Sequence, residues 1–239
     1  MVTPRPRFLR NFAWSAGKRR ISPTALGTET DPPFPGVPPE AFQNRELVNT
    51  VVSHPSLFRI STPIKVDLFE QLLASHPNQP IIESFCKGMR EGFWLWLHPD
   101  AMHPHTFDGS KDVRSDAERL SLEKTRDEEL DAGRFSKAFP VLLPGMHVIP
   151  IHAVPEPRSE GLRLVTDFSG GAFSHNSTIS CLETNQTRMD GIRELADHLR
   201  ALRCSLGPDA EINIFKSDVK GAFKVLPMHL LWQPWQVYR

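Results

Sequence analysis

Between residues 67 and 92 an apolar side chain recurs every three or four positions, the spacing that places side chains on one face of an α-helix. Pro77 ends the first half of this stretch, and Pro80 suits the first turn of a second helix. The pattern predicts helices over residues 67–77 and 80–92 that pack together as a helical hairpin.

Two later segments are also predicted to be helical. Residues 115–131 are dense in charges of both signs, and Lys124 and Glu128 are spaced to pair along a helix. We expect this helix to be exposed, with its charged side chains either solvated or forming a binding face. Asp190 precedes an apolar stripe that continues to Leu202, so we expect Asp190 to be the N-cap of a further helix.

In the second half of the chain, side chains alternate between two faces, the two-residue repeat of a β-strand. Residues 162–167 alternate between two faces, and residues 155–161 before them are rich in turn-forming residues. Paired with residues 148–154, this segment predicts an antiparallel β-hairpin. A further short strand is predicted to begin at Ile212, and the mixture of elements makes the expected fold class α+β.

The first 60 residues lack such periodicity. They include the proline-rich residues 32–39 and few regularly spaced apolar side chains, so we expect an extended arm. The predicted organisation is therefore an extended, basic and proline-rich arm over residues 1–60, a helical region over residues 61–135, and the β-hairpin with the following strand over residues 136–239.

Charge is unevenly distributed along the chain. The 28 basic and 28 acidic residues cancel, which by itself argues against a nucleic-acid-binding protein. Six cations nevertheless precede the first acidic residue, Glu29, and the arm either binds a polyanion through them or keeps them solvated. These arm cations are Arg5, Arg7, Arg10, Lys18, Arg19 and Arg20.

Cysteine content and hydropathy bear on the compartment. Three cysteines, an odd number without paired metal-ligand spacing, favour a reducing environment. No apolar run reaches the roughly 18 residues needed to cross a bilayer, and Pro4 and Pro6 break the helix that a mitochondrial presequence requires. Without a secretion signal, we expect an intracellular protein, cytoplasmic or nuclear, with no membrane partner.

The stretch that carries candidate chemistry is KSDVKGAFKVLPMH, in which Asp218 follows a short apolar run. An aspartate in this place is either a cap or turn residue or a metal ligand. Together with two earlier blocks, GLRLVTDFSGGAFSHNSTI and HPNQPIIESFCKGMREGFW, the stretch resembles the reverse transcriptases of retroelements, in particular those of the tyrosine-recombinase type and related retroelement-derived sequences. The resemblance runs from about Arg7 to Arg239, and the three blocks occur in the family's order.

The resemblance implies the fingers and the first part of the palm of an incomplete right-hand polymerase. It implies that Asp218 is a catalytic ligand of Mg²⁺ and that the main-chain oxygen of Val219 contributes at the nucleotide site. It assigns Arg163 to the triphosphate of the incoming nucleotide, whose oxygens a guanidinium grips in pairs, and Phe223 to the sugar. From the residues alone, a strand-surface pair with a carboxylate explains Arg163 equally well, and a place in the core explains Phe223.

One residue departs from the family's pattern. The family has a lysine in a Val-Pro-Lys-Pro phrase before the arginine, whereas this chain has Glu156 between Pro155 and Pro157. A carboxylate there repels an approaching triphosphate by on the order of 1–4 kcal/mol, which Arg158 offsets in part. The departure suggests that this copy has been released from selection for polymerisation.

The expected function follows from the resemblance. The chain is expected to be a fragment of an RNA-directed DNA polymerase of a retrotransposon, a nucleotidyltransferase that acts on an RNA or DNA template-primer and deoxynucleoside triphosphates. Two-metal catalysis needs a second carboxylate motif that this sequence does not contain, so we expect the chain alone to be inactive. The alternatives are a non-catalytic remnant that binds nucleic acid or protein, and a fragment that folds poorly.

Deleting residues 1–20 tests the arm. If the arm cations hold phosphates, the full chain binds single-stranded RNA or DNA with a dissociation constant of roughly 10⁻⁴–10⁻⁶ M that rises steeply with salt, and the deletion removes most of this binding. Arg163→Ala is the matched control, because that side chain is assigned to the nucleotide. Fluorescence anisotropy at two salt concentrations is the measurement, and a full chain without salt-dependent binding shows that the arm is a solvated tail.

Overall fold

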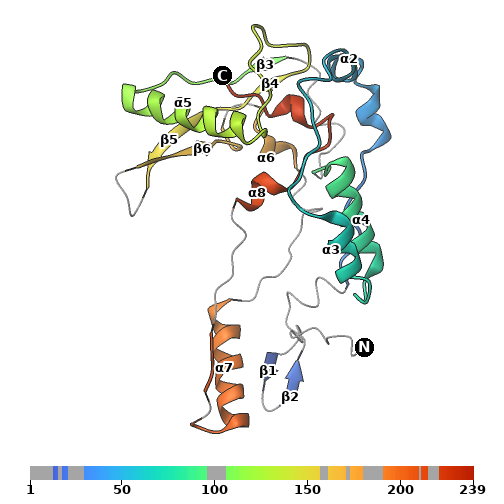
Figure 1. Ribbon diagram of the computed structural model, residues 1–239, viewed down its shortest axis with the longest axis vertical. Helices are drawn as coiled ribbons and strands as arrows, with labels where there is room; N and C mark the ends of the chain where they lie inside the picture. The colour runs from blue at the N-terminus through green and yellow to red at the C-terminus, as the bar shows by residue number, and fades with distance from the viewer. Residues whose placement is uncertain are drawn as a thin grey trace. The chain divides into compact units, whose positions relative to one another are not determined.

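The computed structural model describes residues 13–15, 18–20, 30–95, 106–156, 161–170, 173–179, 191–209, 211–214 and 221–239 (Figure 1). The chain divides into two compact units, each assembled from segments that are distant in sequence. One comprises Met1–Phe34, Leu68–Phe85 and Asn185–Lys220; the other, here called the larger unit, comprises Pro35–Asp67, Cys86–Thr184 and Gly221–Arg239. The three consecutive regions expected from the sequence do not coincide with these units.

The described residues form helices and two-stranded sheets, which confirms the α+β class. The strand pairs are β1 (Ala13–Ser15) with β2 (Lys18–Arg20), antiparallel; β3 (Phe107–Asp108) with β4 (His147–Val148), parallel; and β5 (Ile151–Pro155) with β6 (Leu162–Thr166), antiparallel. The last pair is the predicted β-hairpin. Near β4 the C-terminal segment adds a further bridge, because the Ile149 N–H donates to the carbonyl of Val237 at 2.9 Å.

The hydrophobic core of the larger unit joins α2 (Arg45–Ser53) to tryptophans from distant parts of the chain. The ring of Trp232 packs edge-on against those of Trp94 and Trp235, with centroids 5.7 and 5.3 Å apart. Large aromatic rings bury much apolar area and stabilise such contacts further by their edge-on geometry. The buried members of this core are Ala41, Leu47, Val51, Trp94, Leu231, Trp232 and Trp235.

The segment before residue 60 is not wholly extended. Both η1 (Pro39–Gln43) and α2 are helical, so the expectation of an extended arm is wrong for this stretch. Asn44 caps α2 by accepting the Leu47 N–H at 3.1 Å, and the Thr50 hydroxyl donates to the carbonyl of Pro144 at 2.7 Å. A good N-cap and one apolar stripe make this short helix, and the spacing of Leu47, Val48, Val51 and Val52 is a sequence signal for it.

The predicted helical hairpin is present. Helices α3 (Val66–Leu72) and α4 (Gln79–Glu91) lie against each other, with the rings of Phe69 and Phe85 5.4 Å apart. An ion pair of 2.6 Å joins Arg90 of α4 to Asp67 of α3. The first helix ends earlier than the proline that was expected to end it.

Helix α7 (Ile192–Leu206) is the predicted amphipathic helix, with a different cap. Gly191 occupies the N-cap position, and its N–H donates to the carboxylate of Glu194 at 2.8 Å. Asp190, the expected cap, lies outside the described residues. Within the part of the chain that the structure describes, no helix is both long enough and apolar enough to cross a bilayer.

The strand predicted to begin at Ile212 is not observed in residues 211–214, which have no regular secondary structure. The side chain of Ile214 is 67% exposed, so no packed layer covers it there. A segment with alternating apolar residues forms a stable strand only where it can pair with another strand and pack its apolar face against a core. Residues 215–220, which include Asp218, lie outside the described residues.

Candidate functional site

The β5–β6 hairpin is the part of the expected nucleotide site that the structure describes. Its register pairs Val154 with Arg163 and His152 with Val165. Because opposed residues share a face and successive residues alternate, Arg163 lies on the face of Val165, and Leu164 lies on the other. Arg163 is exposed, whereas the rest of β6 is partly buried. The predicted hairpin is therefore confirmed, with the arginine on a face open to solvent.

Helix α5 (Asp116–Asp131) holds this hairpin through the buried carboxylate of Glu118. Its Oε1 accepts the backbone N–H of Ala153 in β5 at 3.0 Å, and its Oε2 accepts the N–H of Arg114 at 2.8 Å. Ser115 caps the helix by accepting the N–H of Glu118 at 3.1 Å. The hydrogen bond from Ala153, followed by that from Arg114, lowers the pKa of Glu118, although burial acts in the opposite direction. An ionised carboxylate thus ties the helix to the strand.

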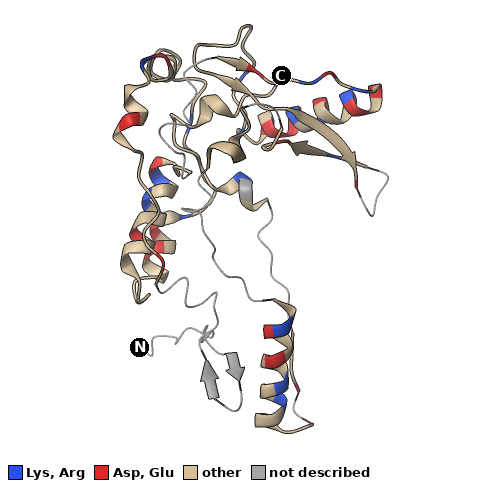
Figure 2. Ribbon diagram, turned by 180° about the vertical axis from the view of Figure 1, so that it is seen from behind, with Lys and Arg blue, Asp and Glu red and all other residues tan. Residues whose placement is uncertain are grey.

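The remaining charges of α5 are of both signs, as the colours along the helix in Figure 2 show, and most of these residues are exposed. The expected pair of Lys124 and Glu128 is present at 3.9 Å, with both side chains largely exposed. Surface pairs of this kind contribute little to stability. This side of the helix is exposed as predicted, while the side that carries Glu118 and Glu129 packs against the unit.

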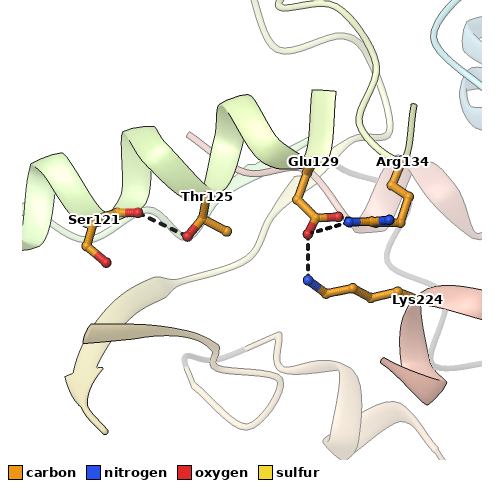
Figure 3. A network of polar contacts seen from close by, with 5 residues as sticks. All are labelled: Ser121, Thr125, Glu129, Arg134 and Lys224. Carbon is orange, nitrogen blue, oxygen red and sulfur yellow. Dashed lines mark hydrogen bonds and ion pairs between the residues drawn. The ribbon is translucent and has the colours of Figure 1, made fainter. Parts of the chain in front are cut away.

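Toward the C-terminal end of α5, the carboxylate of Glu129 joins three segments (Figure 3). Arg134 donates to it with both Nε and Nη2, the latter at 3.0 Å, and Lys224 of α8 (Ala222–Val225) places its Nζ 2.5 Å from Oε1. The Glu129 side chain is only 5% exposed, whereas the side chains of Arg134 and Lys224 remain 40% and 54% exposed. The pairing with Arg134, and next with Lys224, lowers the pKa of Glu129 against the effect of burial.

Helix α8 is held from two sides in the larger unit. Lys224 attaches it to α5, and the hydroxyl of Thr62 donates to the carbonyl of Val225 at 2.7 Å. The helix begins after Gly221, whose φ of +63° is a left-handed conformation that glycine adopts without a steric cost. The chain that follows the predicted metal ligand Asp218 is therefore fixed beside α5 from Gly221 onward.

Only part of the predicted site is described. Arg163 makes no ion pair with any carboxylate in the described ranges, so the alternative of a strand-surface pair finds no partner there. The backbone of Phe223 lies in α8, while Asp218 and Val219 lie outside the described residues. Among the arm cations, the backbone of Lys18–Arg20 forms β2, and the other three also lie outside the described residues.

Glu156 lies just beyond β5, and its N–H donates to the carbonyl of Gly161 at 2.9 Å, which adds one more rung to the hairpin. Being two residues from Val154, it shares the face that carries Arg163. The departure from the family's pattern therefore places an exposed carboxylate on the same face as the guanidinium.

Asp167, at the other end of β6, closes a turn. Its Oδ1 accepts the Ser169 N–H and its Oδ2 accepts from Nζ of Lys111, each at 3.2 Å. Its carbonyl accepts the N–H of Gly170, also at 3.2 Å. The Lys111 contact, and after it the Ser169 bond, lowers the pKa of Asp167. These contacts hold the turn after β6, which agrees with the structural role expected of Asp167.

Within the described ranges, no group of three or more His, Cys, Asp or Glu side chains is arranged to hold a metal ion. No family model matches the sequence, and comparison with curated proteins and with solved structures gives no match. The resemblance to reverse transcriptases therefore rests on the three sequence blocks alone.

The two anchoring carboxylates of α5 were not predicted from the sequence. Ser115 three positions before Glu118 is the spacing of a helix N-terminus, and this signal could have identified Glu118 as a residue of the first turn. Glu129 offers no comparable signal, because Lys224 is 95 positions away.

Replacing Glu129 by Gln is predicted to lower the free energy of unfolding by about 1–3 kcal/mol at neutral pH, because two cations lose the charge with which they pair. The folded-state pKa of Glu129 lies below its ordinary value of 4.5. The stabilisation of the folded state by ionised Glu129 is therefore complete above about pH 4.5 and is lost as the pH falls through the folded-state pKa. Urea unfolding followed by tryptophan fluorescence should show the difference between the two proteins shrinking on acidification.

Glu128→Gln is the matched control, because it removes the neighbouring carboxylate from an exposed pair. We expect it to change the free energy of unfolding by less than about 0.5 kcal/mol. Equal losses in the two variants, or a difference that grows on acidification, would contradict the role of Glu129.

Proposed function

We propose that the chain is the fingers and first palm part of a retroelement RNA-directed DNA polymerase, and that Arg163 binds the triphosphate of the incoming deoxynucleotide. The observation that carries the proposal is an exposed guanidinium on an antiparallel hairpin, paired with no described carboxylate, at the residue to which the sequence resemblance assigns this contact.

The hairpin is built to hold a side chain in place. Its strands pair continuously from Ile151 opposite Thr166 to Pro155 opposite Leu162. An isolated two-stranded hairpin is marginally stable in water, so the attachment of β5 to Glu118 supports its position. A planar guanidinium held in this way suits the paired oxygens of a phosphate.

Helix α5 supplies the second support. Glu118 and Glu129 are eleven positions apart on it, which is about 16 Å along a helix that rises 1.5 Å per residue. Glu118 binds the hairpin, and Glu129 binds α8, the helix that follows Asp218 in the chain. One rigid element therefore fixes both the strand assigned to the nucleotide and the segment after the assigned carboxylate.

In a polymerase of this kind the primer 3′-hydroxyl attacks the α-phosphate and pyrophosphate leaves. The resemblance implies Mg²⁺ at Asp218 and at the main-chain oxygen of Val219, but the described residues offer no ligand set for it. The proposal therefore assigns a role only to this chain's own cation, Arg163, which neutralises charge on the triphosphate and on the departing pyrophosphate. Glu156 on the same face opposes that role and weakens binding.

Arg163→Gln is predicted to weaken the binding of a fluorescent deoxynucleoside triphosphate about tenfold, because a hydrogen-bonded contact to a charged group is lost. Arg126→Gln is the control: it removes the same charge from an exposed residue of α5 that pairs with Asp127 at 2.8 Å. Titration of both variants at one salt concentration measures the effect. If the two variants bind the nucleotide equally well, Arg163 does not hold the triphosphate.

A second substitution tests the inverted charge. Glu156→Lys restores the cation of the family's pattern and is expected to strengthen nucleotide binding in the same titration, whereas Glu128→Lys, the same change on the exposed side of α5, is expected to leave it nearly unchanged. Weaker or unchanged binding by Glu156→Lys would contradict a triphosphate on this face of the hairpin.

A further inference from the structure

Two cations pair with the carboxylate of Glu129, and a third lies beside the loop that follows α5. The two that pair are Arg134 and Lys224 (Figure 3). The third is Arg59, whose guanidinium lies beside Gly133: a Cβ built on that glycine would stand 3.4 Å from Nη1 of Arg59. The segment of Arg59 also reaches α8, where Thr62 binds the carbonyl of Val225. All of these residues belong to the larger unit.

Arg59 is held by its backbone, and its guanidinium is left open. The side-chain amide of Gln233 accepts the Arg59 N–H and donates to the Arg59 carbonyl, both at 2.9 Å, and the same amide donates to the carbonyl of Met228 at 2.8 Å. The guanidinium itself donates only to the hydroxyl of Ser61, at 3.2 Å, and makes no ion pair with any described carboxylate. Most of its five N–H donors therefore remain available at a fixed place.

Among the residues that the structure describes, Glu129 is the one carboxylate that pairs with these cations. Three cations against one carboxylate leave an excess of two positive charges, all on partly exposed side chains. Glu128, the neighbouring carboxylate on α5, is paired with Lys124, and Asp131 makes no ion pair with the three cations. Like charges brought together at a surface repel one another, and a bound anion removes this cost.

We propose that Arg59, Arg134 and Lys224 bind the phosphate backbone of a single-stranded nucleic acid. Guanidinium groups match phosphate oxygens, and the half-exposed side chains form an open surface, which suits a passing strand. Lys65 and Lys137, which lie within a few residues of Thr62 and Arg134 in the sequence, are also exposed. The site lies toward the end of α5 opposite to Glu118, so it binds a strand whether or not Arg163 binds a triphosphate.

The experiment uses the full-length chain in which the six arm cations are replaced by Gln, so that the remaining binding comes from the rest of the protein. The probe is a fluorescein-labelled oligothymidylate of roughly a dozen nucleotides. In this background Arg59→Gln is expected to weaken binding about three- to tenfold at low salt, and to reduce the slope of log K against log salt by about 0.7, the loss of one phosphate contact on a single strand.

Arg126→Gln, with the same loss of charge on the exposed side of α5, is expected to leave affinity and slope unchanged. Arg59→Lys is expected to keep the salt slope while losing part of the affinity, which a purely structural role of Arg59 would not produce. The backbone contacts to Gln233 do not depend on the side chain, so the unfolding midpoint of Arg59→Gln is expected to match that of the parent protein.

Three results would overturn the proposal. The first is an equal effect of Arg59→Gln and Arg126→Gln on oligothymidylate binding. The second is an Arg59→Lys variant whose salt slope is as low as that of Arg59→Gln. The third is an Arg59→Gln variant that loses affinity for dTTP and retains full affinity for the oligonucleotide, which would identify a nucleotide site and exclude a strand site.

Discussion

The ion pairs of Glu129 hold α8 and the segment after α5 to this helix. A buried carboxylate without partners is costly, so this residue requires Arg134 and Lys224 in place. Helix α8 in turn is a single turn, too short to be stable alone, and takes its position from Lys224 and from the bond of Thr62 to Val225. One carboxylate therefore orders a segment that lies 95 positions away in the sequence.

The two sides of α5 have different physical roles. Its exposed side carries charges of both signs that interact mainly with water. The ion pair between Lys124 and Glu128, both of them solvent-exposed, is typical of this side. The other side carries Glu118 and Glu129, which remain ionised because backbone N–H groups and cations solvate them in place of water. Glu118 holds strand β5 in place, and Glu129 holds Arg134 and Lys224 in place. The helix therefore positions both surfaces that are proposed to bind phosphate groups.

Elements with strong local patterns could be predicted from the sequence. Helices α3, α4, α5 and α7 and the β5–β6 hairpin follow from apolar periodicity, capping residues and turn composition within a few residues of each element. The helices before residue 54 were not predicted, because η1 and α2 are short and lie in a proline-rich stretch, although Leu47, Val48, Val51 and Val52 have helical spacing. Their stability comes from packing against Trp232 and Trp235, which no local window contains.

The candidate site could also be predicted only in part. The exposed position of Arg163 follows from strand alternation and could be predicted, whereas the contacts that fix its surroundings join residues far apart in the chain. The place of Arg59 could not be predicted either. Its backbone is held by Gln233, 174 positions later, and nothing near it in the sequence indicates that its guanidinium lies beside Gly133.

A double-mutant cycle on Glu129 and Lys224 measures whether this ion pair holds α8 to α5. The free energy of unfolding is measured for four proteins: the parent chain, Glu129→Gln, Lys224→Gln and the double variant. Their differences give the coupling energy between the two side chains and cancel the contacts that each side chain makes with other residues. Since Lys224 is 54% exposed, solvent screens part of the interaction, and a coupling of roughly 1 kcal/mol at low salt is predicted. If the losses in free energy of unfolding of the two single variants add up to that of the double variant within about 0.3 kcal/mol, the pair does not hold α8 to α5.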